Sequence, residues 1–262
     1  MKEYNTAINP LGSISDIQII VETIKRYNNS DDLKEVRDEF IDGNAFGFDI
    51  TSSRKRFFTV IKKLFLQPKN KNEKSHQFFL EIISKPISTN TKKIILYLET
   101  NRQNDLIRDI NIQLIPKKYK ENRRIITSSE VFDFLTEIKD GTKMDDWSES
   151  TLKTCSYKYI TFMKSLGFFE KENRIKSIFS FPYPDEKIIT YLVYLLKYSN
   201  KTDEEIYNSC LFKALLLSDS EKLELIKKAA IKSYFDFSFA GNGVASFSLS
   251  LKRGEIIDEL FN

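Results

Sequence analysis

The clearest pattern of apolar and polar positions in the chain lies in Thr51–Leu66. Placed about 100° apart, as in a helix, its apolar residues fall on one side and its polar residues on the other. The apolar side consists of Phe57, Val60, Ile61, Leu64 and Phe65. The other side consists of Ser52, Lys55, Arg56, Thr59, Lys62 and Lys63, with Arg54 at its margin. The pattern therefore predicts a helix with one buried face and one face carrying five positive charges and no acid.

The segment before this basic helix predicts a helix–turn–helix arrangement. Asp31–Asp42 has apolar residues at helical spacing, and Gly43, Asn44 and Gly47 then interrupt it, because Gly and Asn adopt positive φ at low cost. Asp49 or Thr51 is expected to cap the basic helix. A helix, a glycine-containing turn and a basic helix are typical of nucleic-acid-binding elements. The alternative is an ordinary surface helix with a solvated lysine face.

Helical periodicity continues through most of the remaining sequence. Residues 1–12 are expected to be extended, and residues 69–77 form a polar segment. Helices are expected over residues 13–27, 77–84, 91–97, 104–114, 129–139, 150–166, 185–198, 202–217, 219–235 and 255–261. Phe235–Ala240 and Val244–Leu251 alternate around Gly241-Asn242-Gly243, which predicts a β-hairpin.

The segment 129–181 has the element order of a winged-helix module. Two predicted helices, the second capped by Ser148 or Ser150, precede Phe168-Phe169, a polar turn and Ile175–Phe179, which together predict a hairpin. The long helix would present Lys153 outward and would enter a major groove, while the wing would present Lys171, Arg174 and Lys176. Winged helices also serve as protein-docking modules, so this pattern indicates a fold more strongly than a function.

A second cluster of positive charge lies in Pro116–Thr127. It contains Lys117, Lys118, Lys120, Arg123 and Arg124, with Glu121 as its single acid. The segment predicts either a solvated linker between modules or the edge of a binding surface.

These patterns predict a mainly α, multi-helical protein. Its expected parts are an N-terminal helical domain (1–115) with the helix–turn–helix-like element, a basic linker (116–128), a central winged-helix-like module (129–181) and a C-terminal helical segment (182–262) with a small β-hairpin.

Composition narrows the choice of function. The net charge of +4 over 262 residues is too small to indicate DNA binding by itself, so clustering of charge is the better evidence. Cys155 and Cys210 lie in apolar patterns and are expected to be buried free thiols. His76, the single histidine, is expected at the surface, and no Cys-x-x-Cys pair occurs, so we expect no metal site and no cofactor. The N-terminus has no apolar core typical of a signal peptide, and we expect a cytoplasmic protein.

The sequence gives little support to an enzyme. It contains neither a Gly-x-x-x-x-Gly-Lys-Ser/Thr loop nor a Gly-x-Gly-x-x-Gly loop. The acid pairs Asp31-Asp32, Asp145-Asp146 and Glu204-Glu205 stand where helices are expected to begin, so capping explains them better than catalysis does. We expect no catalytic residues.

Two blocks of the sequence resemble the BrxA family of bacteriophage exclusion (BREX) phage-defence systems. One is VRDEFIDGNAFGFDITSSRKRFFTVIKKLF, and the other is Trp147-Ser148-Glu149-Ser150-Thr151 leading to Leu166-Gly167-Phe168. The resemblance implies a mostly helical, non-catalytic component that binds double-stranded DNA. It also implies partners in the system's methyltransferase, phosphatase-like and ATPase proteins.

The sequence hypothesis is therefore a double-stranded DNA-binding accessory component of a BREX-type system. The expected DNA contacts are Ser52, Arg54, Lys55, Arg56, Thr59, Lys62, Lys63, Lys117, Lys118, Arg123, Arg124, Lys153 and Arg174. The alternative is a protein-docking adaptor that assembles other defence subunits without functional DNA binding. RNA binding is a third option, and a nuclease is disfavoured.

Overall fold

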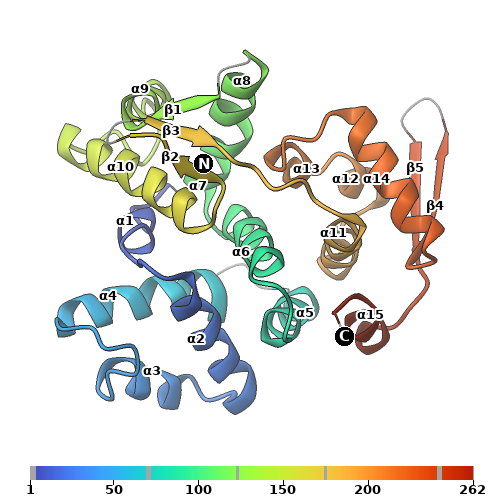
Figure 1. Ribbon diagram of the computed structural model, residues 1–262, viewed down its shortest axis with the longest axis horizontal. Coiled ribbons are helices and arrows are strands. Elements are labelled where there is room, and N and C mark those ends of the chain that lie inside the picture. Colours follow the sequence, from blue (N-terminus) through green and yellow to red (C-terminus); the bar gives the residue numbers. More distant parts are fainter. Residues whose placement is uncertain (1–3, 69–71, 122–123, 174–175, 241–243, 262) are drawn as a thin grey trace. The chain divides into compact units, whose positions relative to one another are not determined.

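The computed structural model describes residues 4–68, 72–121, 124–173, 176–240 and 244–261. The protein is mainly helical (64%) and has two small antiparallel sheets. This confirms the predicted mainly α fold class with a C-terminal β-hairpin. Its internal contacts divide it into two compact units (Figure 1). Unit 1 comprises Met1–Lys69 and Leu96–Pro182, and unit 2 comprises Asn70–Ile95 and Tyr183–Asn262.

The first segment of unit 1 contains the basic helix. Its elements are α1 (Ile8–Leu11), α2 (Ile17–Ser30), α3 (Leu33–Ile41), α4 (Thr51–Ile61) and the π-helix η1 (Lys62–Leu66). The apolar side predicted for Thr51–Leu66 is confirmed, because none of its five side chains is more than 6% exposed. The expectation of an extended N-terminus is wrong at Ile8–Leu11. This single turn is helical because it packs between α4 and α10 (Glu149–Ser165), as Figure 1 shows.

The turn between α3 and α4 follows the prediction in part. Asn44 and Gly47 adopt positive φ values of 48° and 68°, and the Asn44 Oδ1 accepts a hydrogen bond from the Phe48 backbone N–H at 2.8 Å. The predicted cap by Asp49 or Thr51 is wrong. Ile50 occupies the N-cap position in an extended conformation, and no side chain caps the helix.

The second segment of unit 1 combines helices with a three-stranded sheet. Its elements are the end of α6 (Thr89–Gln103), α7 (Asp105–Asp109), the π-helix η2 (Ile110–Leu114), α8 (Ile115–Lys120), β1 (Ile125–Thr127), α9 (Ser128–Ile138), α10, β2 (Phe169–Lys171) and β3 (Lys176–Phe179). The strand order is β1-β3-β2, with Ile125 opposite Ile178 and Phe169 opposite Phe179. The segment predicted as a basic linker thus contains most of α8 and all of β1.

A buried polar network fixes α10 against the rest of unit 1. The Tyr159 hydroxyl donates to the Asn111 Oδ1 at 2.6 Å, and the Asn111 Nδ2 donates to the Asn101 Oδ1 at 3.0 Å. All three side chains are fully buried. Because an unpaired polar atom costs free energy in the interior, this network favours one position of α10 relative to α6 and η2.

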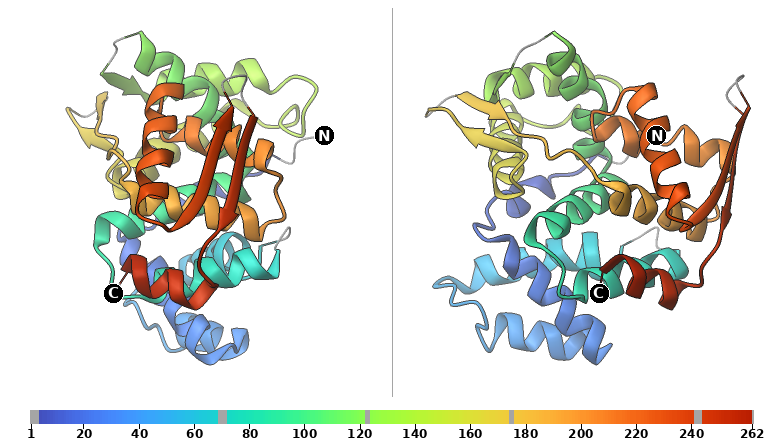
Figure 2. Two further views of the ribbon diagram at one scale, coloured as in Figure 1. Left: turned by 90° about the vertical axis from the view of Figure 1, so that its right-hand side faces the viewer. Right: turned by 45° about the vertical axis from the view of Figure 1, so that its right-hand side comes forward.

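Unit 2 is built around α11 (Glu186–Tyr198). Its other elements are α5 (Glu73–Ser84), the start of α6, α12 (Asp203–Tyr207), α13 (Cys210–Ala214), α14 (Asp219–Ile231), β4 (Phe235–Ala240), β5 (Val244–Leu249) and α15 (Arg253–Phe261). α11 packs against α5 and α14, and the ring of Phe78 stacks on that of Tyr191 with centroids 5.6 Å apart. β4 and β5 pair along their whole length as a two-stranded ribbon beside α14 (Figure 2). The predicted Gly241–Gly243 turn lies outside the described residues.

Three expectations for unit 2 need correction. The helix predicted over 202–217 is two short helices, because Asn208 ends α12 and Ser209 caps α13. The predicted surface position of His76 is wrong: α5 begins four residues earlier than expected, and this places His76 on its buried side, 6% exposed. Cys210 is only half-buried, whereas Cys155 in unit 1 is buried; both are free thiols.

A membrane-spanning helix would need a long, almost uncharged apolar stretch, and none of the helices within the described residues has one.

Candidate nucleic-acid interface

The outward face of α4 and η1 carries the largest group of the expected DNA contacts. Ser52, Lys55, Arg56, Thr59 and Lys63 are exposed, and Lys62 is half-buried. Among the described residues, no acidic side chain lies within ion-pair distance of Lys55, Arg56, Lys62 or Lys63. We name this set of six residues the α4 basic face. Its cations keep their full attraction for an external anion, because no internal carboxylate neutralises them.

Arg54 lies at the edge of the α4 basic face and is held by the protein itself. Its Nη1 donates to the backbone carbonyl of Ile41, and its Nη2 donates to the Thr51 Oγ1 at 2.8 Å. The guanidinium therefore links the end of α3 to the start of α4. Its charge still adds to the local positive potential, but its Nη1 and Nη2 each donate a hydrogen bond within the turn.

The cations predicted to cluster in Pro116–Thr127 lie in different environments, some exposed and one paired with an acid. Lys117 is exposed on α8, and Arg124 is exposed just before β1. Lys118 instead forms an ion pair with Glu130 at 2.8 Å, where both side chains are largely buried. Glu130 also completes a capping box with Thr127 at the start of α9. Burial would raise the pKa of Glu130, but hydrogen bonds from Lys118 and from the Thr127 backbone lower it below its usual value.

The exposed side of α10 is polar and carries Lys153. Ser148 caps this helix, as one of the two predicted caps, and Gly167 ends it with a φ of 77°. The Lys153 ammonium is 2.5 Å from the Glu149 carboxylate one turn earlier and 5.8 Å from the centre of the Phe132 ring. The hydrogen bond from Lys153 and its positive charge lower the pKa of Glu149. Lys153 is thus exposed but partly neutralised.

The end of α10 and β2 brings two further lysines together. Burial lowers the pKa of Lys164 on α10, and the positive charge of Lys171 on β2 lowers it further. Lys171 and Lys176 are exposed on the two strands of the hairpin. Two cations at the junction of a long helix and a hairpin create a local positive potential suited to an anion.

Two of the expected site residues, Arg123 and Arg174, lie outside the described residues.

The identity of the chain follows from one comparison with known protein families. The family model for BrxA matches residues 13–193, which is more than half of the chain. The chain belongs to the BrxA family. BrxA membership implies a component of a BREX phage-defence system and a family that is generally considered non-catalytic. A search of the curated proteins and a search of the solved structures each returned no match.

The BrxA-matched region contains the α4 basic face, α9, α10 and the β2–β3 hairpin, but it begins after α1. Within the part of this BrxA chain that the structure describes, no group of three or more His, Cys, Asp or Glu side chains is placed to hold a metal ion.

Some exposed residues near the expected DNA contacts were not predicted from the sequence as binding candidates. Tyr157 is 60% exposed on α10 and lies beside Lys158, whose ammonium is 5.9 Å from the Tyr157 ring centre. An exposed aromatic ring and a lysine on the polar side of a helix following a capped N-terminus could have indicated a contact surface. Asn5–Pro10, which lies against α4, had no such signal because the segment was expected to be extended.

Proposed function

We infer that this BrxA-family protein binds double-stranded DNA through its α4 basic face and through α10 with the β2–β3 hairpin. The observation that carries the inference is the lack of ion-pair partners, within the described part of the chain, for the cations on α4 and η1. Lys55, Arg56, Lys62 and Lys63 lack carboxylate partners among the described residues, whereas Lys118, Lys153, Lys197 and Lys228 each pair with an acid. Unpaired cations clustered on one helix face are what phosphate binding requires.

The arrangement around α10 supports a winged-helix interpretation. The order β1, α9, α10, β2, β3 with the sheet order β1-β3-β2 fits a long helix that presents its outer side beside a two-stranded wing. Ser150, Lys153 and Tyr157 lie on the exposed side of α10, and Lys171 and Lys176 lie on the wing. In this proposal α10 enters a major groove, and α3 and α4 form a helix–turn–helix-like element whose α4 contacts backbone phosphates. Lys117 and Arg124 add phosphate contacts.

The chemistry favours sequence-tolerant binding. Lysine donates to phosphate as a point charge, whereas arginine binds bidentately, and the α4 basic face has three lysines and one arginine. Phosphate contacts position a protein on the duplex without reading its base sequence. We therefore assign no base preference to this surface.

A titration of a labelled DNA duplex by fluorescence polarisation at several salt concentrations tests the proposal. The decisive variant combines Lys55→Ala, Arg56→Ala, Lys62→Ala and Lys63→Ala. Each lost phosphate contact should reduce the slope of log affinity against log salt by about 1. A matched control combines Lys213→Ala, Lys227→Ala, Lys232→Ala and Lys252→Ala, which removes four exposed lysines of unit 2.

The proposal holds if the α4 variant weakens binding and flattens the salt slope while the unit 2 control keeps both. Equal losses in the two variants would show an effect of net charge alone, and unchanged binding in the α4 variant would remove this surface from the interface. RNA of the same length serves as competitor, and stronger competition by RNA than by DNA would contradict the assignment to duplex DNA.

The second candidate function is a protein-docking adaptor for other BREX proteins, such as the methyltransferase, phosphatase-like and ATPase components. Exposed apolar side chains in unit 2 favour it, since Ile231 is 81% exposed and Val244 is 62% exposed. Ile231 also lines a hollow with Ala230, Phe235 and Phe237, together with the charged residues Lys227 and Asp236. Capture of a BREX component that survives nuclease and high salt, together with no measurable duplex binding, would favour this function over the first.

A further inference from the structure

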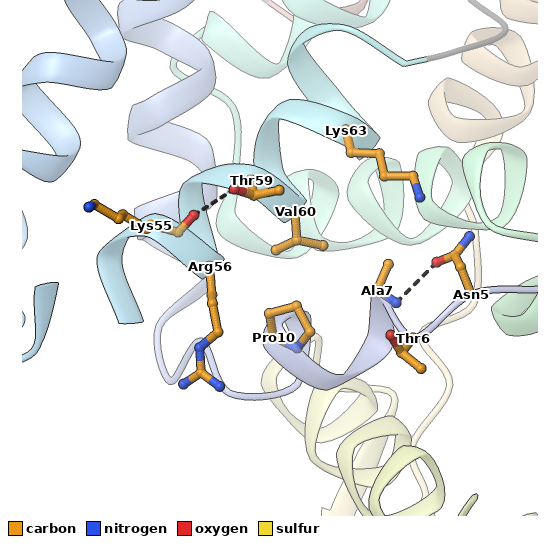
Figure 3. Close-up of a pocket in the computed structure, with 9 residues that line it drawn as sticks. All are labelled: Asn5, Thr6, Ala7, Pro10, Lys55, Arg56, Thr59, Val60 and Lys63. Carbon is orange, nitrogen blue, oxygen red and sulfur yellow. Dashed lines mark hydrogen bonds between the residues drawn. The ribbon is translucent and has the colours of Figure 1, made fainter. Parts of the chain in front are cut away.

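A groove lies between the N-terminal segment and the α4 basic face, with a volume of about 370 Å³. The N-terminal segment forms one wall and α4 with the start of η1 forms the other, as Figure 3 shows. The groove is lined by Asn5, Thr6, Ala7, Pro10, Lys55, Arg56, Thr59, Val60 and Lys63. Its volume lies within the range of small ligand pockets, about 300–1,000 Å³.

The lining combines an apolar floor with a cation at each end. Val60 and Pro10 face each other across the groove, and Ala7 continues the apolar surface (Figure 3). Arg56 extends past Pro10 at one end, and Lys63 extends toward Ala7 at the other, while the Lys55 ammonium points away (Figure 3). No acid lines the groove within the residues that the structure describes.

The N-terminal wall of the groove is anchored on three sides, so the groove exists before a ligand arrives. The Asn5 Oδ1 accepts hydrogen bonds from the Ala7 backbone N–H at 3.0 Å and from the Asn104 Nδ2 at 3.2 Å. The Tyr4 hydroxyl donates to the buried Asp109 carboxylate. At the far end of α1, Gly12 touches the backbone of α10. A fixed wall lowers the conformational cost of binding.

The two features of the lining call for a ligand with both an apolar group and separated negative charges. A DNA backbone supplies anions but no apolar side group for the Val60–Pro10 floor. Arg56 and Lys63 stand seven residues apart, about 10 Å along the helix axis. An extended peptide covers this distance in about three residues. An apolar side chain with a carboxylate on either side therefore matches both the floor and the two cations.

We propose that this groove is a docking site for an acidic, extended segment of a partner protein that carries one apolar anchor. The anchor fills the floor between Val60 and Pro10, and the flanking carboxylates pair with Arg56 and Lys63. Because both cations also belong to the α4 basic face, the segment competes with duplex DNA. Only this competition rests on the proposed function; the docking itself does not.

Polarisation of a fluorescein-labelled peptide, Gly-Asp-Glu-Leu-Ser-Glu-Asp-Gly, whose two glutamates are three residues apart, against the full chain tests the proposal. Two comparison peptides replace the central leucine by serine or all acids by their amides. The leucine peptide should bind at least about tenfold more tightly than either, because each comparison peptide lacks one half of the recognition. Equal binding of the serine peptide would show attraction by charge alone and overturn the proposal, as would no binding of the leucine peptide.

Two variants separate the groove from the DNA surface. Ala7→Leu places a larger apolar side chain over the floor without a change of charge, and Thr6→Phe fills the groove from the same wall, which carries none of the proposed DNA contacts. Each should weaken the leucine peptide about tenfold and leave duplex affinity within about twofold. Arg56→Ala with Lys63→Ala should weaken both ligands, whereas Lys227→Ala with Lys232→Ala should weaken neither.

The outcomes distinguish failure of this proposal from failure of the proposed function. Duplex binding without peptide binding overturns the docking site alone, and peptide binding without duplex binding overturns only the competition and the DNA function. If both groove-filling variants reduce duplex affinity as much as peptide affinity, the groove holds DNA rather than a peptide, and the docking proposal is wrong.

Discussion

Gly12 and Lys158 make backbone contact at the point where α1 meets α10. A β-carbon on residue 12 would lie 2.1 Å from the Lys158 carbonyl oxygen and 2.9 Å from its Cα. Only glycine permits this approach, because the neighbour is backbone within a long helix and cannot rotate away. The contact holds the N-terminal wall of the groove against the helix proposed to enter DNA.

Replacing Gly12 by alanine should therefore destabilise unit 1. The added β-carbon forces α1 away from α10, and we expect a loss of about 2 kcal/mol or more in the free energy of unfolding, measured by urea denaturation. Gly254→Ala is the matched control, since a β-carbon there meets no atom of the described chain within 4 Å. That substitution lies in α15 and should be neutral or slightly stabilising. Equal effects of the two substitutions would contradict the close approach.

Tyr159 and Tyr157 offer a matched pair on one helix. Tyr159→Phe removes the hydroxyl that donates to Asn111 and leaves a buried acceptor unpaired, so we expect a loss of about 1–3 kcal/mol in unfolding free energy. Tyr157→Phe removes an exposed hydroxyl and should change stability by less than about 0.5 kcal/mol. Thermal unfolding of the two variants measures the difference. A stable Tyr159→Phe variant would show that the buried network does not hold α10.

Glu149 is expected to weaken DNA binding by neutralising Lys153. Glu149→Gln should raise duplex affinity about twofold to fivefold at low salt, since it removes one carboxylate beside a lysine of the proposed DNA interface. Glu224→Gln is the control, because Glu224 pairs with Lys228 at the same helical spacing in unit 2. Affinity should be unchanged in that variant. If Glu149→Gln has no effect, α10 does not approach the duplex at Lys153.

Glu130 gives a pH-dependent contribution to stability. Its pKa is lowered in the folded state, so its contribution is fully present above the pKa of the unfolded chain and is lost as the pH falls through the folded pKa. Glu130→Gln should cost about 1 kcal/mol at pH 7, and thermal unfolding should show that the difference from the unsubstituted protein shrinks in acid. Glu137→Gln, an exposed change on the same helix, is the control and should cost less than about 0.5 kcal/mol at pH 7.

Much of the helical architecture follows from local pattern. The apolar side of Thr51–Leu66 specifies burial directly, and Ser148 and Gly167 mark the ends of α10 by ordinary capping chemistry. The strands of the β2–β3 hairpin also follow from their apolar residues around a polar turn.

The elements that were missed depend on contacts distant in sequence. A four-residue helix such as α1 has too few internal hydrogen bonds to form by itself, so its existence depends on packing against α4 and α10. β1 is three residues long and is a strand only because it pairs with β3. His76 is buried because α5 packs against other helices of unit 2. The polar residues that precede His76 in the sequence indicated a surface segment instead.

The same distinction applies to the candidate site, where exposure follows from local pattern and ion pairing depends on distant contacts. Sequence periodicity is enough to place Ser52, Lys55, Arg56, Thr59 and Lys63 on an exposed face. It does not show which cations are already paired with acids. Lys118 pairs with Glu130, which follows β1 in the chain, and no local spacing indicates this pair. The Glu149–Lys153 pair has the spacing of one helical turn and could have been recognised.

The interleaved segments of the two units have a consequence for how the chain is made. α5 emerges early in synthesis, but its partner α11 follows roughly 110 residues later, so Phe78 must wait for Tyr191 before it can be buried. A fragment ending at Pro182 would contain α5 without the helix that covers its aromatic side. Such a fragment should bind chaperones or aggregate during translation, and a ribosome-bound chain should gain protease resistance in unit 2 only after α11 has emerged.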